Sequence, residues 1–292
     1  MVAASRTGLA GAHAIDLSSD VMPVQVTKLI ASIRVDRRSF VEMLKTLLFI
    51  GIAVSVVVFF YERVEYRWQW YRVGRYLIDR RGDVAKPGLL LQGAAVTLKI
   101  SGVSLVAAAS IGLATAMMRL SRSFTANLVA QLYLEAVRNT PLLIQLFFVY
   151  FVLSPIFRFS PFVSAVAALS MFEGAYASEI IRGAILGVPR GQWEAAHSLG
   201  LTTVDAYRYI VLPQAIRNIL PPLAGQAVSL IKDSALVSTI AIYDLTMQGN
   251  AIVSETFLTF EIWFVVAAIY LVMTGSLSLS VHLLERRLRR FA

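Results

Sequence analysis

Cysteine is absent from this 292-residue sequence, and charged residues are scarce. The lack of cysteine excludes disulfides and thiol catalysis. Charged residues make up only 15% of the chain, whereas soluble domains carry about 25%. Hydrophobic residues reach 57% and the mean hydropathy is +0.68. This composition indicates an integral membrane protein.

Several motifs are also missing. No G-x-x-x-x-G-K-[ST] sequence occurs, so we expect no P-loop and no ATP bound by this chain. His197 and His282 have no acidic or cysteine neighbours at metal-ligand spacing, and no Ser-His-Asp or paired-carboxylate pattern emerges. We therefore expect no enzyme activity, no metal and no cofactor in the chain itself. Residues 1–40 lack the apolar core and cleavage site of a signal peptide, and we expect a largely disordered cytoplasmic segment there.

Apolar runs dominate the rest of the chain, and most approach the ~20 residues that span a bilayer. They predict an all-α fold, a polytopic membrane helix bundle, with six spans at about 43–60, 97–118, 127–153, 162–186, 220–243 and 262–284. The net charge is +9 and the pI about 10.0, with basic residues gathered at the ends of the runs. The positive-inside rule then places both termini and the segments 119–126 and 187–218 in the cytoplasm, and we expect no nucleic-acid partner.

Residues 61–90 do not fit this scheme, because aromatic residues and arginines alternate there on the side predicted to lie outside. One interpretation is an interfacial helix with aromatics at headgroup level. A tyrosine-rich connector between spans is equally compatible with the composition. A stacking platform for nucleic acid is a weaker alternative.

A polar module, Arg190 to Pro213, interrupts the apolar runs. Residues 191–199 have helical composition, and Gly200 suits the C′ position that ends a helix with positive φ. Thr202 and Asp205 have capping-box spacing and predict a second short helix, which we expect Pro213 to stop. The pattern predicts two short helices at a fixed angle in the cytoplasm. An ordinary connecting loop is the alternative.

Charged side chains also occur within the predicted spans, where each requires a partner or a wet cavity. Glu135 and Arg138 are three residues apart, as are Glu179 and Arg182. Since residues at this spacing share one face of a helix, we expect two structural ion pairs.

Glu173 has no basic partner three or four residues away on its own helix. One hypothesis pairs it with Lys232 of the fifth span. The other places it on the translocation path, where its carboxylate meets the α-ammonium of an amino acid.

Lys232, Asp233 and Ser234 lie within a span that we expect Pro221 and Pro222 to interrupt. Broken helices with charged residues at mid-membrane are typical of substrate pathways. Neighbouring residues point about 100° apart on a helix, so only one of the two charges can face the path directly. Ser234 would form a polar stripe with the serine four residues later, at 238. Packing against a second subunit is the alternative role for this stripe.

The polar module resembles the EAA signature of ABC importer permeases. Glu194-Ala195-Ala196, Gly200, Ile210 and Leu212-Pro213 match that signature. Three further segments are similar to the polar amino-acid branch, the histidine/glutamine/glutamate type: EAVRNTPLLIQLFFVYF at 135–151, GAYASEIIRGAI at 174–185 and LPQAIRNILPPLAGQAVSLIKDSALVSTI at 212–240. The resemblance covers about 90–290.

This resemblance implies a five-helix permease core at 91–292, preceded at 41–90 by an extra transmembrane helix and a connector. It implies that the loop at 187–218 docks on a separate ATPase subunit that uses ATP and Mg. The residues that would carry this coupling are Glu194, Ala195, Ala196, Gly200, Leu212 and Pro213. Further expected partners are a second permease subunit, a periplasmic or extracellular amino-acid-binding protein and membrane lipid.

The implied function is inward transport of polar amino acids across the bacterial inner membrane. An ion-gradient-driven secondary amino-acid transporter is the alternative. Such a transporter needs no cytoplasmic coupling module and often shows paired repeats, whereas this sequence has the module and shows no inverted repeat.

Overall fold

The computed structural model describes residues 37–63, 66–79 and 85–289. The chain divides into two units, Met1–Arg67 and Trp68–Ala292. Most of the segment expected to be disordered, residues 1–36, lies outside the described residues. In the first unit, α2 (Arg37–Arg63) is a helix of 27 residues. It begins six residues before the predicted first span, so residues 37–40 are helical.

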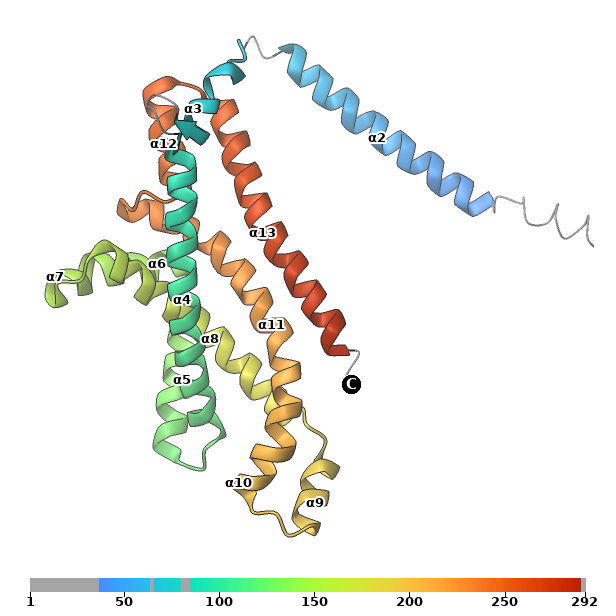
Figure 1. The fold of residues 1–292 in the computed structure, drawn as a ribbon, viewed down its shortest axis with the longest axis vertical. Helices are drawn as coiled ribbons and strands as arrows, with labels where there is room; N and C mark the ends of the chain where they lie inside the picture. The colour runs from blue at the N-terminus through green and yellow to red at the C-terminus, as the bar shows by residue number, and fades with distance from the viewer. Residues whose placement is uncertain (1–36, 64–65, 80–84, 290–292) are drawn as a thin grey trace, which may run out of the picture. The chain divides into compact units, whose positions relative to one another are not determined.

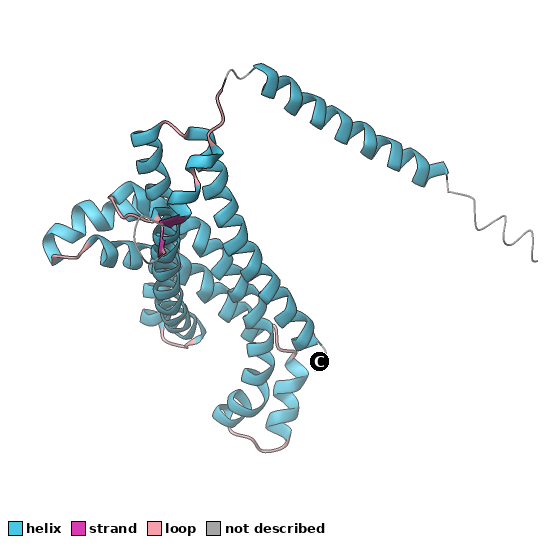
Figure 2. Cartoon of the chain, turned by 45° about the horizontal axis from the view of Figure 1, so that its top comes forward, coloured by secondary structure: helices cyan, strands magenta, loops and turns pink. Residues whose placement is uncertain are grey.

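The second unit is built around two long helices, α4 (Leu89–Leu120) and α8 (Pro161–Leu186), which run side by side (Figures 1 and 2). Small residues allow this close approach. A Cβ added to Gly112 would lie 2.7 Å from the Cβ of Ala177. Tight backbone contact over small residues is how helices associate where lipid removes the hydrophobic driving force.

Four further helices of at least twelve residues pack around this pair. They are α5 (Phe124–Arg138), α11 (Leu212–Asp233), α12 (Leu245–Thr256) and α13 (Thr259–Arg289). Among the described helices, Leu89–Leu120 and Thr259–Leu283 are each long and apolar enough to cross a membrane, and a bent pair could form one more span.

That bent pair corrects the third predicted span. Instead of one helix, α5 ends at Arg138 and is followed by α6 (Leu142–Phe147), a π-helical stretch η2 (Phe148–Leu153) and α7 (Ser154–Phe157). The helix axis bends by 106° between the two halves. Pro141 disfavours helical geometry at the preceding residue, so the helix breaks there. The Gln145 amide bridges the corner: its Nε2 lies 2.7 Å from the Val137 carbonyl oxygen and 2.8 Å from Thr140 Oγ1.

The proline positions were interpreted wrongly as helix stops. After α9 (Arg190–Ser198), the elements α10 (Thr203–Ala206), the π-helical η3 (Tyr207–Val211) and α11 follow one another without a gap. The π turn, in which the Leu212 N–H donates to the Tyr207 carbonyl, precedes Pro213. α11 also continues through Pro221 and Pro222. The regular helix ends at Asp233, where the 3-10 segment η4 (Ser234–Ile240) begins.

The segment between the fifth and sixth predicted spans contains α12. Its N-cap is Asp244, whose buried carboxylate accepts hydrogen bonds from the Met247 N–H and the Tyr270 hydroxyl. Gly93 of α4 lies against this cap, because a Cβ there would be 2.8 Å from the Asp244 carbonyl oxygen. These contacts fix α12 to α4 and α13.

The connector before α4 consists of short elements: η1 (Trp70–Arg72), α3 (Gly74–Leu77) and the antiparallel strands β1 (Ile78–Asp79) and β2 (Lys86–Pro87). A continuous interfacial helix is therefore wrong for the described part of 61–90. Trp68 and Trp70 stack at 5.9 Å. Both contact Phe264, and the Gln69 N–H donates to the buried Glu261 carboxylate at 2.6 Å, so the connector is held on the start of α13.

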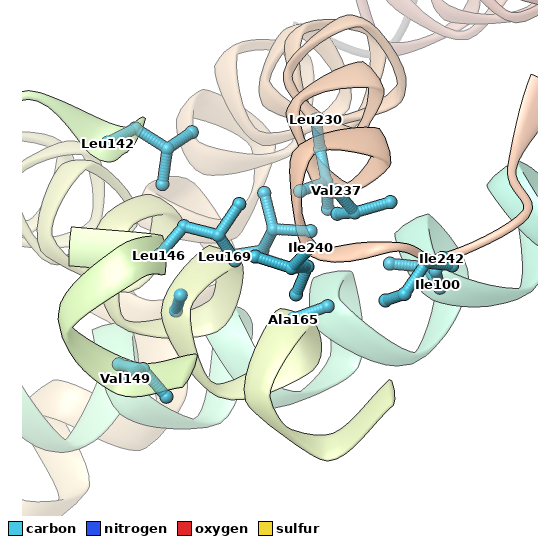
Figure 3. Close-up of a cluster of buried hydrophobic side chains, with 11 residues drawn as sticks. Ile100, Leu142, Leu146, Val149, Ala165, Leu169, Leu230, Val237, Ile240 and Ile242 are labelled. Atoms are coloured by element: carbon cyan, nitrogen blue, oxygen red, sulfur yellow. The ribbon is translucent and has the colours of Figure 1, made fainter. Parts of the chain in front are cut away.

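The largest apolar cluster lies where α4, α6, α8 and η4 meet (Figure 3). Leu146, Leu169 and Ile240 are buried at its centre. It holds the bent pair and η4 against α8, and so fixes the end of α11 beside the middle of α8.

Candidate functional site

The polar module has a defined hydrogen-bonded turn. Gly200 has φ +76°, a conformation that favours glycine. The Leu201 N–H donates to the Ala196 carbonyl at 3.1 Å, and the Gly200 N–H donates to the His197 carbonyl at 2.9 Å. This pair of bonds is a Schellman motif. The glycine at 200 therefore ends α9 as the sequence predicts.

The next helix starts with the expected cap. Thr202 Oγ1 accepts the Asp205 N–H at 3.2 Å, and the Thr202 hydroxyl donates to Asp205 Oδ2 at 2.6 Å. The two helices are thus joined by a turn in which backbone N–H groups close the end of α9 and the Thr202 side chain caps the start of α10. An ordinary flexible loop does not describe this segment.

The module is anchored to the membrane helices by an apolar cluster. Its buried members come from α4, α8, the following turn and the start of α11: Ala116, Ile181, Ile185, Val188, Val211 and Ala215. Trp193 of α9 packs against this cluster and meets the Tyr207 ring edge-on at 4.8 Å. Gln214 Nε2 also lies 3.3 Å from Gln192 Oε1. The module therefore cannot shift without moving the ends of α4, α8 and α11.

The residues of the EAA pattern divide between the two sides of the module. Ala196 is fully buried, so its small side chain serves packing inside the module. Ile210 is half-buried, and the remaining pattern residues are exposed: Glu194, Ala195, Gly200, Leu212 and Pro213. Two large apolar side chains at the tip, Leu199 and Val204, are 78% and 74% exposed. Sequence reasoning missed this apolar tip, although both residues flank Gly200 closely.

Glu173 contacts an acid rather than the expected base. Its side chain is only 4% exposed, and its carboxyl group lies against that of Asp233 from the end of α11. No Glu173–Lys232 ion pair occurs among the described residues, and Lys232 is exposed. The proposed pairing fails because Asp233 instead occupies the face of α11 that meets α8. A carboxylate only accepts hydrogen bonds, so this contact requires a proton or another cation between the groups.

A cavity of about 370 Å³ adjoins Glu173. Apart from Glu173 and Gln226, it is lined by apolar residues of α4, α8, α11 and α13. Gln226 contributes a polar group to its wall, and Gln226 Oε1 is buried without a hydrogen bond from the described residues. Gln226 lies seven residues before Asp233, two turns away on the same face of a helix. That spacing was available in the sequence and was missed.

Ser234 is buried at the start of η4 and donates to the Ile231 carbonyl at 2.8 Å. Ser238 donates to the Ala235 carbonyl at 2.7 Å. Because a 3-10 helix has about three residues per turn, residues four apart do not share a face. The expected polar stripe of Ser234 and Ser238 is therefore wrong.

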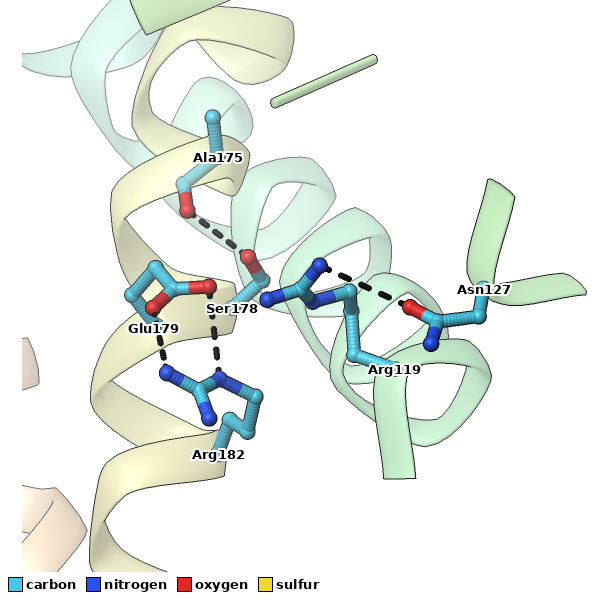
Figure 4. Close-up of polar contacts among 6 residues, drawn as sticks. All are labelled: Arg119, Asn127, Ala175, Ser178, Glu179 and Arg182. Carbon is cyan, nitrogen blue, oxygen red and sulfur yellow. Dashed lines mark hydrogen bonds and ion pairs between the residues drawn. The ribbon is translucent and has the colours of Figure 1, made fainter. Parts of the chain in front are cut away.

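The two i,i+3 charge pairs differ. Arg182 Nη2 lies 2.9 Å from Glu179 Oε2, and Arg182 Nε lies 3.4 Å from Oε1, so this pair forms (Figure 4). The other expected ion pair does not form within the described chain. Glu135 accepts from Asn139 Nδ2 at 2.8 Å, while the Arg138 guanidinium lies 5.9 Å from the centre of the Tyr176 ring. Glu135 therefore interacts with Asn139 at the C-cap, and Arg138 interacts with the Tyr176 ring of α8, in place of the ion pair.

His197 and His282 lie apart, on α9 and on α13. His197 Nδ1 lies 2.7 Å from the Trp193 carbonyl oxygen, and His282 lies 3.8 Å from Glu285. No group of three or more His, Cys, Asp or Glu residues within 37–63, 66–79 and 85–289 has the geometry to hold a metal ion.

Comparisons with known proteins agree with this architecture. Residues 108–290 match the family described as binding-protein-dependent transport system inner membrane component. The glutamine transport system permease protein GlnP of Escherichia coli (strain K12) is 41% identical over 204 residues, covering 69% of this chain and 93% of the relative. The L-cystine transport system permease protein TcyB of Bacillus subtilis (strain 168) is 39% identical over 206 residues, covering 70% and 88%.

Solved structures give the same result. A structure described as an amino acid ABC transporter with histidines superposes with a TM-score of 0.65 at 42% identity, covering 68% of this chain and 94% of that chain. The MetNI methionine ABC transporter, in an inward-facing conformation, shares the fold with a TM-score of 0.61 at 18% identity, over 68% and 96% of the two chains.

A bundle of membrane helices carrying a rigid polar module between α8 and α11 defines a transporter permease. The chain belongs to the family of binding-protein-dependent transport system inner membrane components, and is a permease subunit of an ABC importer. Its role is transport and not enzymatic catalysis, as ATP hydrolysis in such systems belongs to a separate subunit.

Proposed function

We propose that this chain carries polar amino acids inward, and that its module Arg190 to Pro213 receives the movement of an ATPase subunit that binds ATP and Mg. The anchored module supports this proposal most directly. Its exposed apolar tip, Leu199 and Val204, is suited to a groove on another protein, since exposed apolar residues on a polar surface favour interfaces. The buried base of the module transmits displacement to three membrane helices.

Amino acids are the proposed substrate class on two grounds. The relatives include permeases named for glutamine and cystine. The chain also places Glu173 in the wall of a cavity of about 370 Å³, and the contact of Glu173 with Asp233 needs a proton or a cation. An α-ammonium group supplies that cation and donates to both carboxylates.

The proposed path therefore includes Glu173 and Asp233, with Ser234 shaping the end of α11. In the described part of the chain, Lys232 is exposed and forms no ion pair with Glu173, which makes it a candidate for contact with a second permease subunit instead. We propose that two permease subunits, identical or related, enclose the path. A binding protein would deliver the amino acid from outside, and both termini and the module would face the cytoplasm.

Reconstitution tests this function. The permease, its ATPase and its binding protein are placed in vesicles, and uptake of labelled L-glutamine, L-cystine and L-histidine is measured with and without internal or external ATP and with ion gradients. We expect uptake of at least one amino acid that requires ATP on the module's side of the membrane. Uptake driven by a proton or sodium gradient without the ATPase would overturn the proposal in favour of a secondary transporter.

A single variant tests the path. Glu173→Gln removes the carboxylate but keeps the shape, so we expect uptake to fall at least tenfold while the ATPase still copurifies. Glu255→Gln, on the exposed part of α12, is the matched control and should transport normally. Unchanged uptake by Glu173→Gln would remove this residue from the path.

A further inference from the structure

Guanidinium groups from three helices gather around one carboxylate near the lower ends of α4 and α8. Arg182 forms the bidentate contact with Glu179 described above. Arg119 of α4 and Arg138 of α5 lie close enough to act on the same carboxylate electrostatically. Three arginines and one carboxylate therefore share this region, where positive charge is in excess.

The local acceptors do not balance this excess. Glu135 of α5 lies three residues before Arg138, but its carboxylate accepts a hydrogen bond from Asn139. Arg138 itself contacts the face of the Tyr176 ring. A ring face attracts a cation but accepts none of the directed hydrogen bonds of a guanidinium fork.

Arg119 is the least satisfied of the three. Its Nη1 makes a long contact of 3.5 Å with Asn127 Oδ1 (Figure 4). Its Nε is buried and makes no hydrogen bond to the described residues. A buried donor without an acceptor is destabilising, so this arrangement favours a ligand that brings an acceptor.

We propose that Arg119, Arg138 and Arg182, arranged around Glu179, form a binding site for an oxyanion, either the carboxylate of the transported amino acid or the phosphate of an anionic phospholipid. Arginine forks match the geometry of both groups. The Glu179 and Arg182 side chains are 28% and 29% exposed, so a ligand can reach the site.

The position of the site on α8 gives it a place in transport. Glu179 lies six residues beyond Glu173, about 9 Å further along the helix axis toward the module. An amino acid is a zwitterion with an ammonium group and a carboxylate. The acidic pair suits the first group and the arginines suit the second, so a substrate moving inward would leave one site for the other. This reading of the ligand as substrate rests on the proposed function.

Arg119→Gln tests the site, with Arg122→Gln as the matched control. Arg122 lies in the exposed turn after α4, so Arg122→Gln removes the same charge at a position outside the cluster. The probes are the amino acid selected by the uptake panel and its carboxamide, which lacks the negative charge. Binding to the purified permease–ATPase complex is measured by equilibrium dialysis in phosphatidylcholine nanodiscs.

If the oxyanion is the substrate carboxylate, the native complex and Arg122→Gln should bind the amino acid about tenfold more tightly than the carboxamide. This factor corresponds to about 1.4 kcal/mol, within the range of a charge-assisted hydrogen bond. In Arg119→Gln the preference should fall below about twofold. Arg119→Lys keeps the charge without the fork and should give an intermediate preference, and its melting temperature shows that the fold persists.

The lipid arm uses vesicles of phosphatidylcholine with phosphatidylglycerol, followed by native mass spectrometry. If the oxyanion is a lipid phosphate, the native complex should retain phosphatidylglycerol, Arg119→Gln should lose it, and the carboxamide should bind as well as the amino acid. An Arg119→Gln complex that matches the native one in both arms would overturn the proposal. A complex that binds no amino acid at all, yet retains phosphatidylglycerol through Arg119, would count against the proposed function and not against the site.

Discussion

Two glycines are each required for a different reason, Gly112 for close packing and Gly200 for its backbone conformation, and each is compared with another glycine as its control. Gly112 faces α8, and an added Cβ would meet Ala177 at 2.7 Å, whereas Gly102 on the same helix has nothing within 4 Å. We expect Gly112→Ala to destabilise the fold by about 1–3 kcal/mol through overpacking. Gly102→Ala should stabilise it by up to about 1 kcal/mol through helix propensity. Thermal unfolding in detergent measures both, and equal effects of the two changes would contradict the packing seen here.

Gly200 is governed by backbone conformation and not by space. Its surroundings are open, but its φ of +76° is one that side chains rarely adopt. Gly200→Val should cost about 1–2 kcal/mol, while Gly200→Asn should cost less because asparagine tolerates the left-handed region. The affinity of the permease for its ATPase, measured by pull-down titration, should fall in the same order. Gly191→Val, in α9 with open space around it, provides the comparison, and a loss there as large as at 200 would argue against the turn as the cause.

At the scale of elements, the sharp corner between α5 and α6 depends on one side chain. Gln145 donates to the Val137 carbonyl and to Thr140 across the break. We expect Gln145→Leu to remove the donor from the part-buried Val137 carbonyl and to cost about 1–3 kcal/mol. Limited proteolysis at 139–141 should become faster. Gln131→Leu on the exposed face of α5 should leave the cleavage rate unchanged, and equal protection of both variants would show that Pro141 alone holds the corner.

The elements also show where sequence reasoning succeeded and where it could not. Gly200, Thr202 and Asp205 were sufficient to predict the module, because caps are local and their geometry follows from a few residues. The prolines misled, since a helix tolerates them when a π turn or neighbouring helices accommodate the missing hydrogen bonds. The contact of Glu173 with Asp233 instead of Lys232 depends on the rotation of α11 against α8. No spacing along the chain records that rotation, and the same is true of the orientation of Arg138 toward Tyr176.

At the scale of the whole molecule, the division of the chain predicts which part can be removed. All four apolar clusters of the described core, and the module, lie within Trp68–Ala292. We expect a chain lacking residues 1–67 to insert, to bind its ATPase and to retain cooperative unfolding within about 1 kcal/mol of the full chain, since unrelated surface changes rarely exceed that amount. Copurification and a melting curve measure this. Loss of ATPase binding on deletion would mean that α2 supports the core directly.

The uninterrupted run from Thr203 to Asp233 has a mechanical consequence. A helix of that length is about 46 Å long, with the turn at Gly200 near one end and the contact of Glu173 with Asp233 at the other. Such a rod acts as a lever: a tilt of one degree about one end moves the other by about 0.8 Å. A rotation of only a few degrees at the module would then carry Asp233 away from Glu173 by more than the length of a hydrogen bond. The grip on a substrate's ammonium group could thus be released by a stiff element alone, with no hinge near the substrate.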